Sequence, residues 1–312
     1  MDMQAVDTTG SSVLAAGAAA PAPPRARMSS PRWGLYLLPP LAFVLFFLIA
    51  SQAPFIQSSF YKDLRLGRVG TELTIVNYVT LALDPFYVDA AITTVQLSAI
   101  VATLTLLIGF PVAYILARMT SWWSLVLLAT IVTTSFITIV IKVLGIIIIF
   151  SANGQLNRTL LALGIVDAPI TVIGRPSGVI IGLLHFTMGF AVMLLYSVVR
   201  TIPRSLEEAA QIHGSSRLRV FQRVVIPLAA PGAVSAGLVV FNLCMGAFTS
   251  TALLGGGNIF TLPILIQQTV ILETKYALGA AISTVLLVAT LLINLLSVAL
   301  IARLRASYSV RT

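Results

Sequence analysis

The chain has 312 residues, of which 58% are hydrophobic and only 9% are charged. Soluble domains usually carry about 25% charged residues, so this composition excludes an ordinary water-soluble protein and indicates one that crosses a membrane several times. The formal net charge of +9 would suit a nucleic-acid partner only if the basic residues formed one face. They flank apolar segments instead, so no nucleic-acid partner is expected and the lipid bilayer is the expected surrounding.

The N-terminal region divides into a polar tail and an apolar segment. Residues 1–31 are rich in Ala, Ser, Gly and Pro, which predicts a disordered cytoplasmic tail. The apolar segment Trp33–Phe55 follows. One alternative is a cleavable signal peptide, because Ser51–Ala53 resembles a weak cleavage site. The long neutral tail and Pro54 favour an uncleaved transmembrane helix.

Further along the chain, five more segments reach the roughly 20 residues that a bilayer span needs. They are Ala91–Leu116, Trp123–Ile141, Gly178–Val198, Gly232–Leu254 and Leu278–Ile301. No strand alternation is long enough to build a sheet. The predicted fold is therefore an all-α membrane protein whose six transmembrane helices occupy residues 32–304, with a cytoplasmic tail over 305–312.

The distribution of basic residues predicts the orientation of these helices. With six spans, both termini lie on one side, and that side would carry twelve Lys and Arg residues against six on the other. Cytoplasmic loops carry the excess of Lys and Arg. Both termini are therefore predicted to be cytoplasmic, together with the loop at 199–231 between the fourth and fifth spans.

This loop has the pattern of a short helix with defined ends. Ser205 and Glu208 fit an S-x-x-E capping box, and Glu207 and Glu208 suit the positive end of the helix dipole. Gly214 is the natural residue for the C-terminal stop. The predicted structure is helix, turn, helix.

Beyond the turn, Ser215 or Ser216 is placed to cap a second short helix, and Pro227 leads the chain back toward the membrane. Ala209 and Ala210 would let another surface approach the first helix closely. An ordinary basic loop needs charge alone for topology. The combination of cap, alanine pair, glycine stop and proline favours a docking element for a cytoplasmic partner.

The same loop resembles a known family. Glu208-Ala209-Ala210, three residues, Gly214, nine residues and then Val224-x-Ile226-Pro227 is similar to the EAA signature of ABC-transporter permease subunits, with Val224 and Ile226 in place of the usual Ile and Leu. The resemblance covers about residues 33–303. The stretches NYVTLALDPFYVDAAITTVQLS, GFPVAYILAR and SANGQLN are most similar to the spermidine/putrescine-type branch of that family.

The resemblance implies an ATP-driven importer subunit in the bacterial inner membrane that is itself no enzyme. The chain has no G-x-x-x-x-G-K-[ST] loop, so it is expected to bind no cofactor and ATP would be used by a partner. The implied partners are a cytoplasmic ABC ATPase dimer, a periplasmic solute-binding protein and a second, related permease subunit. The implied ATPase-coupling residues are Ser205, Glu207, Glu208, Ala209, Ala210, Gly214, Arg217 and Pro227.

The candidate translocation path is defined by polar residues in or near the spans. Lys142 either faces the bundle interior or extends its amine to the outer interface. Asn242 and Thr249 are seven residues apart and would share one helical face. No acidic residue lies convincingly within a span, which argues against a polyamine as the solute.

Other functions are less well supported by the sequence. A secondary transporter is the main alternative, and it should show coupling carboxylates or broken helices within its spans. An enzyme or a metal site would need a constellation that two histidines and one cysteine do not provide. A structural scaffold would leave the pattern of the 199–231 loop unexplained.

Overall fold

The computed structural model describes residues 33–64 and 67–309. Within them, six helices are long and apolar enough to cross a membrane, which confirms the predicted all-α fold with six spans. The chain divides into two units, one ending at Ser51 and one beginning at Gln52, and each is described by itself. The predicted tail at 1–31 and the last three residues lie outside the described part of the chain.

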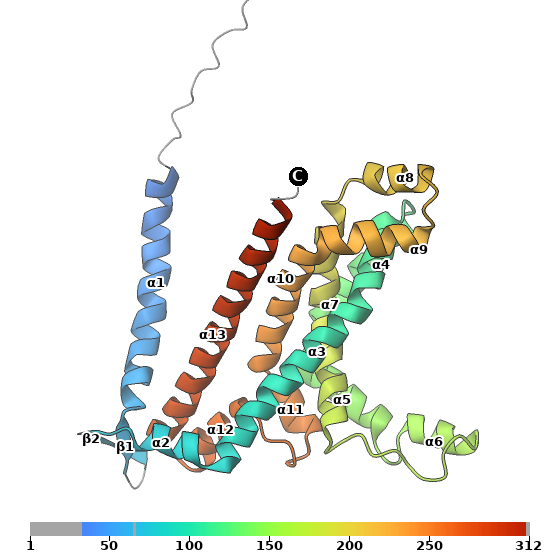
Figure 1. Ribbon diagram of the computed structural model, residues 1–312. Coiled ribbons are helices and arrows are strands. Elements are labelled where there is room, and N and C mark those ends of the chain that lie inside the picture. The colour runs from blue at the N-terminus through green and yellow to red at the C-terminus, as the bar shows by residue number, and fades with distance from the viewer. Residues whose placement is uncertain (1–32, 65–66, 310–312) are drawn as a thin grey trace, which may run out of the picture. The chain divides into compact units, whose positions relative to one another are not determined.

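Four of the six spans are single helices. They are α1 (Trp33–Ser58), α3 (Pro85–Arg118), α7 (Pro176–Arg200) and α13 (Tyr276–Ser309). α13 runs beyond the predicted end of its span at Ile301, so residues 305–309 of the predicted C-terminal tail are helical. Within the second unit, α3, α7 and α10 (Ile226–Met245) pack against one another, and α3 crosses α7 in the view of Figure 1.

The third span differs from the prediction at 123–141. The candidate span of the structure is Ile139–Ala162, so the predicted range is divided between its first helix, α5 (Ile139–Phe150), and α4 (Trp123–Ser135), which alone is too short to cross. The Thr134 and Ser135 hydroxyls donate to carbonyls one turn back in α4. Hydroxyl bonds of this kind also occur in the continuous helix α3, and neither Pro nor Gly marks the break in the sequence.

The fifth span is also displaced from its predicted position at Gly232–Leu254. A single helical segment runs from Arg217 to Met245 through α9 (Arg217–Val220), a π-helical turn η2 (Phe221–Val225) and α10 (Ile226–Met245). Pro227 cannot donate to the carbonyl one turn back, and its ring would clash there in a regular helix. The wider π turn relieves that clash, so α9 is the start of the span and not a separate surface helix.

The core of the second unit is apolar and lies between α3, α5, α7 and α10. Its buried side chains include Val101, Val143, Leu183, Phe241 and Leu254. Small residues bring the helices close together, as expected where lipid offers no hydrophobic drive for association. At Gly237 of α10, for example, a Cβ atom would meet the Leu106 side chain of α3.

The end of the second unit opposite α8 (Arg204–Ile212) and α9 is built from short elements (Figure 1). They are β1 (Tyr61–Asp63), β2 (Val69–Leu73), α2 (Val76–Leu83), α6 (Gln155–Ala162), α11 (Thr249–Leu254), α12 (Leu262–Gln267) and the π-helical turn η3 (Gln268–Leu272). β1 and β2 pair antiparallel, a two-stranded hairpin too short for the sequence pattern to reveal.

This hairpin holds the start of the last span. The two carboxylate oxygens of Asp63 accept hydrogen bonds from the backbone N–H groups of Ala277 and Leu278, both at 2.8 Å. These amides belong to the first turn of α13, which has no partners for them within the helix. Asp63 therefore acts as an N-terminal cap across 214 residues of sequence.

We expect Asp63→Ala to lower the free energy of unfolding by about 1–2 kcal/mol, because two first-turn amides lose their acceptor. Thermal unfolding of the purified protein in detergent measures the effect. Glu72→Ala is the matched control, since Glu72 is an exposed carboxylate on the neighbouring strand. Equal melting temperatures for the two variants would contradict the capping role.

Candidate functional site

The segment between the fourth and fifth spans contains α8 (Arg204–Ile212), whose start differs from the predicted capping box. Pro203 occupies the N-cap position with extended backbone angles, and no side chain caps this end. Ser205 is therefore one residue inside the helix, where its hydroxyl cannot serve as the cap. The proline fixes its own φ near the value that the helix entry requires, so it replaces the serine as the start signal.

The other end of α8 has the predicted glycine stop. Gly214 has a φ of +83°, and its N–H donates to the Gln211 carbonyl, while the Ser215 N–H donates to the Ala210 carbonyl. These two bonds form a Schellman motif, which satisfies the last carbonyls of the helix. The Ser216 hydroxyl then accepts from the Arg219 N–H at the start of α9, as predicted.

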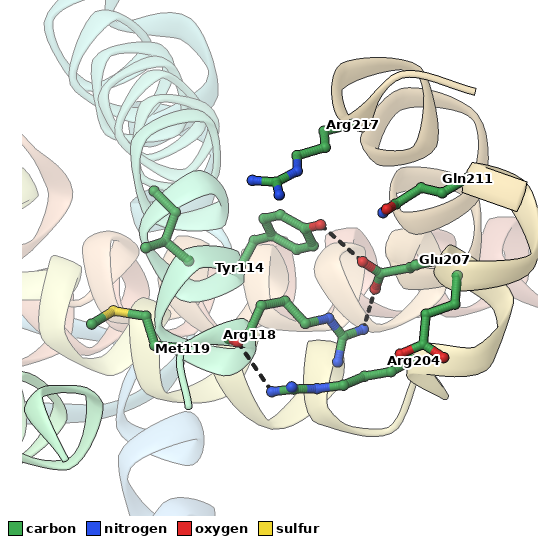
Figure 2. A pocket seen from close by; sticks show the side chains of 9 residues that line it. Tyr114, Arg118, Met119, Arg204, Glu207, Gln211 and Arg217 are labelled. Atoms are coloured by element: carbon green, nitrogen blue, oxygen red, sulfur yellow. Dashed lines mark hydrogen bonds and ion pairs between the residues drawn. The ribbon is translucent and has the colours of Figure 1, made fainter. Parts of the chain in front are cut away.

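The inner face of α8 is held to α3 by a buried ion pair (Figure 2). Glu207 is only 7% exposed, and its carboxylate lies 2.5 Å from the Arg118 guanidinium. The Tyr114 hydroxyl donates to the other carboxylate oxygen at 2.9 Å. Tyr114 and Arg118 are one turn apart in α3, so a single helical face presents both. We call these three residues the Glu207 cluster.

Two arginines extend the contact to backbone carbonyls. The Arg204 guanidinium donates to the carbonyls of Ala117 and Arg118, which end α3 and carry the negative end of its dipole. The Arg118 guanidinium donates to the Ile202 carbonyl in the link before α8. Removing one partner of a buried ion pair typically costs about 3–5 kcal/mol, so α8 and the end of α3 form one mechanical unit.

A pocket of about 500 Å³ opens beside the Glu207 cluster (Figure 2). It is lined by Tyr114, Ile115, Arg118, Met119, Arg204, Glu207, Glu208, Gln211 and Arg217. Arg217 begins α9 and extends toward the Tyr114 side of the pocket. Arg217 is therefore brought to the same site as Glu207 and Glu208, while Pro227 lies further along, in the first turn of α10.

The outer face of α8 is exposed and partly apolar. Ile212 is 84% exposed and Leu206 is 45% exposed, and Leu218 of α9 is 65% exposed. Glu208 and Ala209 lie exposed between the two α8 residues, and Ala210 is partly buried. We call Leu206, Glu208, Ala209, Ile212 and Leu218 the α8 outer face, with Glu208 at its edge because it also lines the pocket. Bulky apolar side chains gathered on one short helix are typical of a partner-binding surface.

Within the spans, Lys142 is buried and not extended to an interface. It is only 8% exposed, and its ammonium donates to the Ser135 carbonyl at 3.4 Å, across the break between α4 and α5. The alternative in which its amine reaches the outer interface is therefore wrong. The break leaves backbone carbonyls of α4 without helical partners, and Lys142 supplies a donor to one of them.

The other two predicted path residues do not share a helical face. Asn242 lies in α10, whereas Thr249 begins α11, and the helix ends at Met245 between them. Asn242 and Asn294 of α13 exchange two amide hydrogen bonds at 2.9 and 3.0 Å. Asn242 thus joins two spans, an arrangement that polar residues often adopt in membranes.

The spans and the α8 site together define a class of protein, the multi-pass membrane protein with an amphipathic helix held at one end of its bundle. The match to a family model specifies the class further. Residues 106–307 match the model for the binding-protein-dependent transport system inner membrane component. The chain belongs to this family and is a permease subunit of the ABC importer type.

Curated relatives and solved structures agree with this assignment. The spermidine/putrescine transport system permease protein PotB of Escherichia coli is 34% identical over 213 residues, which cover 68% of this chain and 77% of the relative. PotB of Haemophilus influenzae is 30% identical and covers 68% and 73%. A bacterial ABC transporter involved in import of the polysaccharide alginate shares the fold, with a TM-score of 0.69, 18% identity and coverage of 87% and 96%.

Sequence reasoning missed four residues that the structure places in these contacts. They are Tyr114, Arg118, Arg204 and Asn294. Arg118 and Arg204 contribute to the sequence analysis only through the charge balance, although a tyrosine one turn before an arginine at a span end is a visible signal. Asn294 is the second asparagine within a predicted span, which is the signal for an interhelical pair.

We expect Gly214→Ala to destabilise the end of α8 by about 1–2 kcal/mol, because L-residues other than Asn and Asp rarely adopt this positive φ. A methyl group added at Gly214 would meet no neighbouring atom within 4 Å, so the cost is conformational and not steric. Gly214→Asn is the control. Hydrogen exchange of the α8 amides should rise in Gly214→Ala more than in Gly214→Asn, and equal exchange in both would contradict this account.

We expect Lys142→Met to reduce solute uptake by roughly tenfold, the effect of losing a contact worth about 1.4 kcal/mol. A buried intramembrane amine is costly to keep, which favours a role in transport. Lys142→Arg keeps the charge and should retain most uptake. Normal uptake with Lys142→Met, at equal amounts of inserted protein, would show that the amine serves only the helix break.

Proposed function

We propose that the 199–231 segment is the cytoplasmic coupling loop of this permease and that α8 docks into a cleft of a separate ABC ATPase. Both chain termini would then lie on the cytoplasmic side, as the Lys and Arg distribution favours. ATP would be hydrolysed by that partner, and this chain would bind no cofactor. The supporting observations are the family membership and the position of α8 at one end of the bundle (Figure 1).

The observation that carries the docking proposal is the α8 outer face. A helix in water normally turns its large apolar side chains inward, whereas Ile212 is 84% exposed. Glu208 adds a carboxylate beside these apolar groups and is free of the inner-face ion pair. Helix-in-groove recognition uses such apolar anchors, and the neighbouring charge would fix the orientation of the helix in its cleft.

The remaining assembly follows from the family. A periplasmic solute-binding protein would deliver the solute to the end of the permease opposite α8, and a second, related permease subunit would complete the membrane domain. ATP-driven closure of the ATPase dimer would move α8 as a rigid element. The proline start and the glycine stop of α8 suit a helix that moves without unravelling.

The solute is proposed to be a small, polyamine-like compound, on the names of the PotB relatives. Lys142 is proposed to line or control the path, together with Asn242 of α10 and Thr249 of α11. The buried charged residues of the described chain are Lys142 and Glu207, and Glu207 lies in α8. A polycation would therefore meet no buried carboxylate in the described spans, so its positive charges would need neutral oxygen ligands or acids from the second permease.

The docking proposal is tested by capture of the ATPase. We expect Glu208→Lys to weaken co-purification of the ATPase by about tenfold, equivalent to about 1.4 kcal/mol. Glu72→Lys makes the same charge change on an exposed strand at the opposite end and should leave capture unchanged. Equal capture by both variants would contradict the docking role of Glu208.

A second variant addresses the apolar part of the outer face. Ile212→Asp removes an exposed apolar side chain, so it should not harm the isolated permease but should abolish ATPase capture.

Uptake of labelled putrescine and spermidine, measured in cells that carry the whole transporter, tests the solute. Uptake of neither polyamine, with the complex assembled, would overturn the polyamine-like assignment while leaving the docking proposal intact.

A further inference from the structure

α8 is connected to the membrane spans covalently at both of its ends and also through side chains. The covalent links are Thr201–Pro203, which follows α7, and the turn at 213–216, which leads into α9 of the fifth span. The side-chain connection is the Glu207 cluster, which joins α8 to α3, a helix separated from it by about 90 residues of sequence. Both covalent links are non-helical, so they transmit little rotation, whereas the cluster fixes a side chain of α8 to two side chains of α3.

The cluster is arranged to resist movement in more than one direction. The Glu207 carboxylate takes Arg118 on one oxygen and the Tyr114 hydroxyl on the other, which restrains its rotation. Arg204, in the first turn of α8, holds the terminal carbonyls of α3 from a second point. Two attachment points on one helix define its orientation, so α8 cannot tilt without moving the end of α3 or breaking the pair.

α3 is placed to carry such a movement through the whole bundle. Its 34 residues span about 51 Å at 1.5 Å per residue. It packs along α7 and α10, and near its other end the Thr94 hydroxyl accepts a hydrogen bond from the Leu262 N–H of α12 at 2.9 Å. One continuous helix therefore contacts α8 at one end and the short elements of the opposite end at the other, with Pro111 removing one of its backbone hydrogen bonds just before Tyr114.

We propose that the Glu207 cluster transmits the movement of α8 to α3, so that α3 is the span through which ATPase closure reaches the far side of the membrane. This rests on the proposed docking function of α8. Tyr114, Arg118 and Glu207 are positioning residues in this scheme, since none of them contacts ATP or solute. Glu208, the neighbouring carboxylate on the outer face, binds the ATPase, and Glu207 passes on the motion.

The separation of these two glutamates makes the proposal testable. A defect in docking lowers ATPase capture and transport together. A defect in transmission leaves capture intact and lowers the amount of solute moved per ATP hydrolysed. A purely structural role of the cluster would instead lower the amount of inserted protein and leave that ratio unchanged in the protein that remains.

The experiment uses the whole transporter, with its ATPase and binding protein, reconstituted in liposomes. Glu207→Gln keeps the shape and removes the charge, Tyr114→Phe removes one hydrogen bond, and Glu72→Gln is the isosteric control. We expect wild-type ATPase capture in all three variants. The ratio of solute transported to ATP hydrolysed should fall by about fivefold or more in Glu207→Gln, less in Tyr114→Phe, and not at all in the control.

A charge exchange supplies a readout that a loss of stability would not mimic. Glu207→Arg with Arg118→Glu restores an ion pair with reversed signs, and it should recover part of the ratio lost in Glu207→Arg alone. If Glu207→Gln fails to insert, the comparison of Tyr114→Phe and the exchanged pair decides the matter.

Two results are decisive against these ideas and distinguish them. An unchanged transport ratio in Glu207→Gln, Tyr114→Phe and Glu207→Arg, with the ATPase bound, overturns the transmission role and leaves the docking function standing. Failure of the wild-type permease to capture an ATPase overturns the proposed docking function itself.

Discussion

The fold depends on one constraint, which is that the hydrocarbon of a bilayer offers no hydrogen-bond partners to the backbone. Continuous helices such as α7 meet this constraint by themselves. The break between α4 and α5 interrupts this pattern, and there the Lys142 ammonium donates a hydrogen bond to the Ser135 carbonyl. The displaced fifth span meets it differently, because a π turn keeps the helix continuous through Pro227.

At the ends of the bundle, side chains of other elements bind the backbone groups that the helices leave unpaired. Helix ends expose unpaired amides and carbonyls, and side chains distant in sequence reach them. Arg204 of α8 binds the last carbonyls of α3, and Asp63 of β1 binds the first amides of α13. The terminal groups that one helix cannot satisfy thus attach a second element to it. In this protein the Arg204 attachment holds α8 against the end of α3, and the Asp63 attachment holds the hairpin against the start of α13.

The sequence was informative wherever one residue type determined the local structure. Six apolar segments indicated the number of spans, and Gly214 indicated the end of α8, since few other residues accept its φ of +83°. It was less informative where the outcome depended on competition between neighbours. At the break after Ser135 the apolar run contains neither Pro nor Gly, so no single residue signals the break.

Side-chain partners were the hardest feature to predict. Glu207 and Glu208 are adjacent and chemically alike, yet one is buried in an ion pair and the other is exposed. The difference arises because adjacent residues of an α-helix are rotated by about 100°, so Glu207 faces α3 while Glu208 does not. The partners Tyr114 and Arg118 come from a helix about 90 residues earlier. A short sequence motif cannot show contacts between residues so far apart in the chain.

The long-range cap of α13 has a consequence for how the protein is made. Asp63 leaves the ribosome more than 200 residues before the amides that it binds. During synthesis its carboxylate stays hydrated and without these partners until the four spans between Asp63 and α13 have been made. The final helix, α13, thus completes the contacts of the hairpin. A chain that stops short of Tyr276 would leave the hairpin without its partner, and cellular quality control could recognise that unfinished end.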